Sequence, residues 1–184
     1  TSIDIGGSSL RILAGERGVE LPIERSPTGE LTAEARERLT REIRAFLAGG
    51  LFSRKVVGGV SSRGASLRNF RLPPAAKEET GRLVALQLEK EFPLSPQELA
   101  WGYAAVSRNG PAPSSTPPGQ EVTVAALRRE VLDSYSELLA ACGLKAVFTL
   151  GLLAGTSLCP RPAGPQWVVH IRRTQSELVD FQEG

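Results

Sequence analysis

The sequence has no methionine, one histidine and two cysteines. These low counts limit the metal sites, catalytic groups and disulfides that the chain can form. Because translation starts with methionine, we expect the chain to be a piece of a longer protein. His170 has no second histidine, cysteine pair or carboxylate near it in the sequence, so we predict no metal site and no catalytic role for it. Cys142 and Cys159 cannot build a disulfide framework, and we expect Cys142 to be a small buried thiol in a reducing compartment.

The sequence also has no long run of apolar residues and no large excess of charges of one sign. The longest apolar candidate, residues 146–155, is shorter than the ~18 residues of a membrane span, so we expect no direct membrane insertion. Lysine and arginine number 22 and aspartate and glutamate 20, and aromatic residues make up 5% of the chain. A net charge of +2 with so few aromatic side chains gives no electrostatic or stacking case for a nucleic acid partner.

The pattern of apolar and turn-forming residues predicts a mixed α/β fold. Alternation at 67–72 predicts an exposed or edge strand, and Trp101 and Trp167, in expected strands, are predicted to pack in a core or an interface. Other strands are expected at 2–5, 10–14, 19–24, 54–60, 99–106, 121–127, 145–150, 167–171 and 177–181, and helices at 32–48, 77–92, 128–142 and 152–158.

Helix ends and helix faces can also be predicted. Thr32 is placed to cap the first helix, and Gly143 to end the third. The third helix has the clearest apolar stripe, and we expect that stripe to face the core. It consists of Val131, Leu132, Tyr135, Leu138, Leu139 and Cys142.

Residues 3–11, IDIGGSSLR, carry the main functional signal. A carboxylate at the end of a strand, Asp4, could hold Mg²⁺ through water. Consecutive glycines allow positive φ and let backbone N–H groups approach a phosphate, while hydroxyls and an arginine add donors. The plain alternative is a hairpin whose glycines serve its geometry alone. The predicted cofactor-binding residues are Asp4, Gly6, Gly7, Ser8, Ser9 and Arg11.

Short segments spread in order over nearly the whole chain carry a family resemblance. Their order and spacing resemble the PilM family, actin-like proteins of type IV pilus assembly that are related to the division protein FtsA. The type II secretion protein GspL has the same fold without nucleotide binding. The segments are 3–11, 54–62, 67–73, 86–94, 122–130 and 138–146.

The resemblance implies an actin-like, ribonuclease H-like subdomain with an inserted α+β subdomain. Subdomain 1A would comprise 1–63 and 151–163, the inserted subdomain 1C 64–150, and the truncated first hairpin of subdomain 2A 166–184. Each half of an actin-like fold opens with a phosphate hairpin. His170 and Glu177 have the seven-residue spacing of Asp4 and Arg11. However, His170 stands in place of a second Asp and Arg172 in place of a glycine, so we expect the second hairpin to keep its shape and lose its chemistry.

The resemblance also implies a function. It is that of a cytoplasmic scaffold, peripheral at the inner membrane, in type IV pilus or type II secretion assembly. Its implied partners are the cytoplasmic tail of an inner-membrane PilN-like protein and an assembly ATPase. ATP with Mg²⁺ is the family's cofactor, but we expect weak binding or none here. We predict no catalytic residues and no enzymatic activity.

An alternative is a fragment of a sugar or acyl-phosphate kinase from the same superfamily, whose opening the DIGG segment also resembles. Such an enzyme needs an aspartate beside the substrate hydroxyl. Besides Asp4, the chain has Asp133 on the polar face of an expected helix and Asp180 in the last expected strand. Neither precedes a glycine turn, and this interpretation therefore ranks second.

Overall fold

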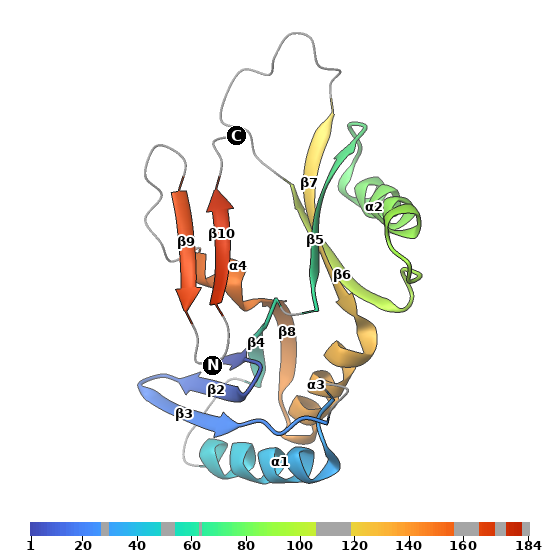
Figure 1. Cartoon of the computed structure of the whole chain (residues 1–184). Helices are drawn as coiled ribbons and strands as arrows, with labels where there is room; N and C mark the ends of the chain where they lie inside the picture. Colours follow the sequence, from blue (N-terminus) through green and yellow to red (C-terminus); the bar gives the residue numbers. More distant parts are fainter. Residues whose placement is uncertain are drawn as a thin grey trace. The chain divides into compact units, whose positions relative to one another are not determined.

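A computed structural model of the chain describes residues 1–26, 30–48, 54–62, 64–105, 119–156, 166–171 and 176–181. They form two compact units, one comprising Thr1–Arg63 with Val131–Phe181 and the other Gly64–Glu130 (Figure 1). The expected helices and strands are all present, with described ends within two residues of those predicted. The fold is mixed α/β, as the sequence predicts.

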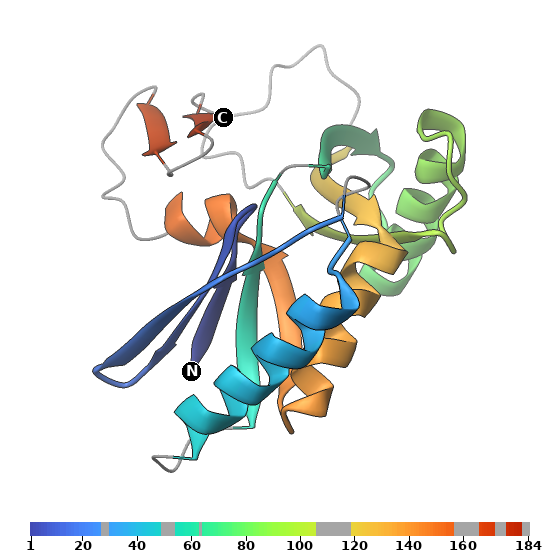
Figure 2. The ribbon, with the colours of Figure 1, turned by 60° about the horizontal axis from the view of Figure 1, so that its bottom comes forward.

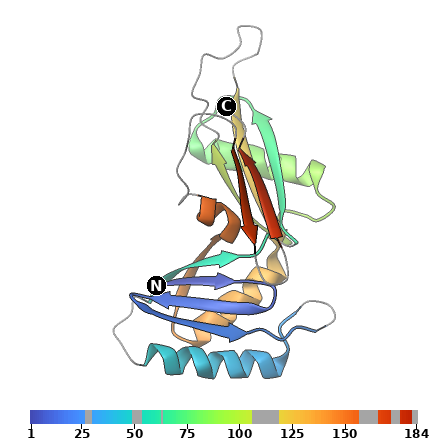
Figure 3. The same ribbon diagram turned by 60° about the vertical axis from the view of Figure 1, so that its left-hand side comes forward.

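The first unit is built on a five-stranded sheet with the strand order β3-β2-β1-β4-β8. Strands β1 to β3 form an antiparallel meander, whereas β4 and β8 run parallel to β1. Figure 3 shows this meander with a helix beneath it. The strands are β1 (Ser2–Ile5), β2 (Ser9–Ala14), β3 (Arg17–Pro22), β4 (Lys55–Val60) and β8 (Lys145–Leu150).

Helices α1 (Ala33–Leu47) and α3 (Arg129–Ala141) lie on the same face of this sheet (Figure 2). The Thr32 side chain accepts a hydrogen bond from the Ala35 N–H at 3.1 Å, which confirms the predicted cap. Alternate residues of the strands point at the helices and are buried with them. The core of this unit includes Ile3, Ile5, Leu10, Ile12, Leu39, Ile43, Tyr135, Leu138 and Leu139.

The apolar stripe of α3 is buried only in part. Tyr135, Leu138 and Leu139 are buried as predicted, but Val131 is 38% exposed, so its expected place in the core is wrong. Cys142 is half-buried, and its Sγ donates to the Thr40 carbonyl at 3.7 Å. Burial raises the pKa of the Cys142 thiol. The helix ends as predicted at Gly143, whose φ of 76° suits a residue without a Cβ.

The second unit packs one helix against a three-stranded antiparallel sheet. The helix is α2 (Lys77–Glu91), and the strand order β5-β7-β6 confirms β5 (Ser66–Leu72) as an edge strand. Strand β6 is Leu99–Ala105 and β7 is Gln120–Arg128. Trp101 packs against the core as predicted. That core comprises Phe70, Leu72, Val84, Leu88, Leu99, Val122, Val124 and Ala126.

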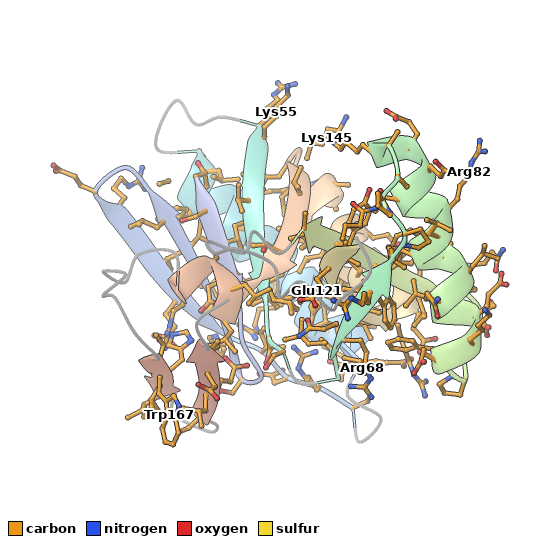
Figure 4. All side chains as sticks on the ribbon, turned by 90° about the horizontal axis from the view of Figure 1, so that it is seen from above. Lys55, Arg68, Arg82, Glu121, Lys145 and Trp167 are labelled. Atoms are coloured by element: carbon orange, nitrogen blue, oxygen red, sulfur yellow. The ribbon has the colours of Figure 1, made fainter. Side chains whose placement is uncertain are left out.

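The first unit also contains α4 (Gly151–Thr156) and a hairpin of β9 (Gln166–Ile171) and β10 (Ser176–Phe181). The outer face of the hairpin carries four large apolar side chains that are 57% to 77% exposed: Trp167, Val169, Ile171 and Leu178. Trp167 is 70% exposed and points away from the ribbon (Figure 4), so it does not pack in the core, and the other predicted role, packing in an interface, stays a prediction. Among the described helices, none is long and apolar enough to cross a bilayer.

Residues 131–150 belong to the first unit, and not to the same unit as residues 64–130. The family resemblance places them in the inserted subdomain, but β8 pairs with β4 along its whole length, from Lys55 opposite Lys145 to Val60 opposite Leu150. The second unit consequently ends at Glu130. The proline-rich segments at 106–118 and 159–165 lie outside the described residues. The assignment of these units to subdomains 1A, 1C and 2A stays a prediction.

Candidate functional site

An open cavity of about 650 Å³ lies within the first unit and is lined by residues of its five-stranded sheet, α4 and β9. Its polar lining comes from four strands: β1, β2, β3 and β8, together with one residue of β9. Small residues of β4 and α4 form another part of the wall. The polar residues are Ser2, Asp4, Arg11, Glu20, Thr149 and His170.

Asp4 and Arg11 belong to the predicted cofactor site, and both line this cavity. They are directly opposite each other on the antiparallel strands β1 and β2, so their side chains share one face of the sheet. Arg11 forms an ion pair with Glu20, with 3.1 Å between Nη2 and Oε1. The two side chains are 49% and 55% exposed, and a pair so well hydrated contributes at most about 1 kcal/mol. The Arg11 guanidinium is therefore readily available to an anion.

Gly59 on β4 brings α4 close to Asp4. A Cβ on Gly59 would lie 3.2 Å from the Cα of Gly151 and 3.7 Å from Oδ1 of Asp4. The first of these distances is too short for an unstrained contact, so a side chain here would displace the start of α4. Gly59 thus permits the approach of α4 that shapes this wall of the cavity, a feature that the sequence analysis did not assign to it.

The turn at 6–9 lies apart from Asp4 and Arg11. None of its four residues lines the cavity. The Gly6 N–H donates to the Ser9 carbonyl at 2.8 Å and the Ile23 N–H to the Ser8 carbonyl at 2.9 Å. Within the described ranges positive φ is confined to three other glycines, so this turn does not use the positive φ that its glycines allow. That Gly6, Gly7, Ser8, Ser9, Asp4 and Arg11 hold one cofactor stays a prediction.

The second hairpin contacts the exit of β4 through a buried carboxylate. Oε1 of Glu177 accepts hydrogen bonds from the Ser62 N–H, at 3.1 Å, and from the Ser62 hydroxyl. The Glu177 side chain is 7% exposed, and its Oε2 lies 3.7 Å from Nδ1 of His170, its cross-strand neighbour. His170 therefore has a carboxylate near it in space although none is near it in the sequence, because the antiparallel register places residues seven positions apart opposite each other. Arg172 lies outside the described residues.

Acidic groups elsewhere do not add to the site. In the described part of the chain, no three His, Cys, Asp or Glu side chains gather closely enough to hold a metal ion. Asp133 is on the exposed side of α3, Asp180 is on the exposed side of β10, and neither lines the cavity. Asp4 is consequently the one aspartate of the three in the cavity wall.

Magnesium and ATP, the cofactor implied by the family resemblance, fit these residues only in part. Asp4 offers a carboxylate for a hydrated Mg²⁺, and Arg11 offers a cation for a phosphate. On the opposing hairpin, His170 lines the cavity where the family pattern has a second carboxylate. The residues present therefore suit one half of a phosphate site, with Asp4 and Arg11 as the groups that would hold cation and phosphate.

Two solved structures have a fold similar to that of this chain. No protein-family model matches the sequence, and no curated protein sequence matches it. A chain of the PilM–PilN type IV pilus biogenesis complex superposes with a TM-score of 0.74 and 24% identity over 98% of this chain. This chain spans 57% of the length of that one.

A second solved structure is also similar. The cytoplasmic domain of EpsL, an inner-membrane component of the type II secretion system of Vibrio cholerae, gives a TM-score of 0.58. It is 16% identical, and the match covers 97% of this chain and 70% of that domain. The predicted resemblance to the PilM and GspL fold is confirmed, because this chain shares its mixed α/β fold with both solved structures.

Proposed function

We propose, from this shared fold, that the chain is part of an assembly scaffold of a type IV pilus or type II secretion system. The observation that supports the proposal is the extent of the structural match, which runs over 98% of the chain. In this proposal the protein is cytoplasmic and peripheral at the inner membrane through its partner.

The proposed partner is the cytoplasmic tail of a PilN-like inner-membrane protein, with an assembly ATPase as a further partner. The support for a PilN-like tail is that the similar structure is a complex of PilM with PilN. Tails of this kind bind as extended or helical peptides, and edge strands such as β5 can accept an added strand.

A peptide from the cytoplasmic N-terminus of the cognate PilN-like protein is expected to bind the chain with micromolar-range affinity, about −8 kcal/mol. The measurement is a titration by calorimetry or fluorescence anisotropy. A scrambled peptide of the same composition is the control, because it keeps the charge and removes the order of side chains. Absence of binding by folded chain, with no difference between the two peptides, would contradict the partner assignment.

Nucleotide binding is proposed to be degenerate. Asp4 and Arg11 supply one half of a phosphate site, and His170 occupies the opposing wall. Binding from one side forgoes the charge-assisted hydrogen bonds of the second hairpin, which are the stronger kind of polar contact.

Mg-ATP is therefore expected to bind more weakly than about 1 mM, so that millimolar ATP stabilises the fold by no more than ~0.4 kcal/mol. Thermal-shift series with Mg-ATP and Mg-ADP provide the measurement. Asp4→Ala and, as a matched control, the exposed Asp133→Ala would be compared with the unaltered chain. A saturable shift at tens of micromolar that Asp4→Ala abolishes and Asp133→Ala preserves would show that a single half-site suffices.

A further inference from the structure

The four carbonyl groups of the turn at 6–9 are all engaged by donors from the protein. Ser8 and Ser9 carbonyls accept from the Ile23 and Gly6 amides, as described above. The other two carbonyls, those of Gly6 and Gly7, accept from a single side chain, Arg25. One arginine therefore determines which way two consecutive peptide groups face.

Arg25 is itself held in place by α3. Its Nε donates to the Gly7 carbonyl at 2.9 Å, and its Nη2 donates to the Gly6 carbonyl at 3.1 Å and to the Tyr135 hydroxyl at 2.5 Å. The guanidinium also lies 5.6 Å from the centroid of the Tyr135 ring. A planar fork with several fixed donors can make these bonds together, which a lysine ammonium cannot reproduce in the same geometry.

The orientation of these carbonyls fixes the orientation of two amides. In a planar trans peptide the C=O and the N–H point in opposite directions, and none of the described peptide bonds is cis. The N–H groups that share peptide planes with the Gly6 and Gly7 carbonyls are those of Gly7 and Ser8. Both consequently point away from Arg25, and neither donates to a protein acceptor in the described contacts of the turn.

Two successive amides that point the same way form a concavity suited to an oxyanion. Ser8 is exposed, so solvent ions can reach this side of the turn. We propose that Arg25 is a positioning residue that turns the Gly7 and Ser8 amides outward to bind a phosphate group. The inference concerns the turn and not the cavity lined by Asp4 and Arg11, and it rests on the proposed phosphate binding of this hairpin. It adds a residue outside the glycine motif, 18 positions after Gly7.

The test is a titration of the full chain with inorganic phosphate at constant ionic strength, followed by the amide resonances of Gly7 and Ser8. In the unaltered chain both are expected to shift in a saturable way at millimolar phosphate. Arg25→Lys keeps the charge but loses the fork, and is expected to raise the midpoint at least about fivefold, the effect of roughly one hydrogen bond.

Arg17→Lys is the matched control. Arg17 lies on β3, in the sheet to which the strands beside the turn belong. Its guanidinium lies 4.9 Å from the centroid of the Phe46 ring and donates to the Phe46 carbonyl at 3.2 Å. Arg17 therefore makes contacts similar to those of Arg25, but away from the turn. Its lysine variant is expected to keep the phosphate midpoint of the unaltered chain. A loss of phosphate response in this variant as well would overturn the specific role of Arg25.

The outcomes separate the two levels of the proposal. Absence of saturable shifts in the unaltered chain would exclude phosphate binding at the turn itself, and equal midpoints in the unaltered chain and Arg25→Lys would overturn only the role of Arg25. If Arg25→Lys fails to fold, Tyr135→Phe decides, because it removes the hydroxyl that holds Arg25 and leaves the ring. A midpoint raised about twofold in that variant supports the proposal, and an unchanged midpoint overturns it.

Discussion

Replacement of Leu39 by alanine is expected to lower the free energy of unfolding of the first unit by about 3 kcal/mol. Leu39 on α1 has no exposed surface, and it is among the largest fully buried side chains of the described residues. Its removal takes apolar surface out of the core and leaves a cavity that a sheet and two helices can fill only partly. The measurement is denaturant unfolding followed by circular dichroism.

Leu13→Ala is the matched control for this change. Leu13 on β2 is 54% exposed on the opposite face of the same sheet, so truncation returns little buried surface to water. We expect a loss below about 1 kcal/mol. Equal effects of the two substitutions would mean that the core does not lie between this sheet and α1, and would contradict the fold described here.

Replacement of Glu177 by alanine is expected to release the β9–β10 hairpin. Two strands alone are marginally stable in water, so this hairpin needs contacts to the rest of its unit. Glu177 supplies them through two hydrogen bonds from Ser62, and its carboxylate is nearly buried. Hydrogen bonds to a charged group are the stronger kind, and truncation leaves the Ser62 donors without this acceptor.

The expected result is at least about tenfold faster hydrogen exchange at the amides of 166–171 and 176–181, the effect of losing roughly 1.4 kcal/mol of local stability. Leu178→Ala is the control, since Leu178 is the next residue on β10 and is 57% exposed on the outer face. It should change exchange in the hairpin less than about twofold. Unchanged exchange in Glu177→Ala, with a normal response elsewhere, would show that other contacts hold the hairpin.

The sequence by itself determined the helices and strands, because their signals are local. The period of apolar residues, the Thr32 cap and the glycine at 143 each act within a few residues, and the structure confirms them. The edge position of β5 followed from its alternation in the same way. The ordered family segments also sufficed to predict the fold that PilM–PilN and EpsL share with this chain.

Only the tertiary structure decided which side chains meet. The pairing of β8 with β4 joins residues about 90 positions apart and moves 131–150 into the first unit, which no local pattern could indicate. The same holds for Arg25, which lies 19 positions from Gly6 and 18 from Gly7. It also holds for Glu177, which lies 115 positions from Ser62. A sequence motif specifies the residues of a turn. The donors that orient its peptide groups come from residues that are distant in the sequence, and only the fold brings them to the turn.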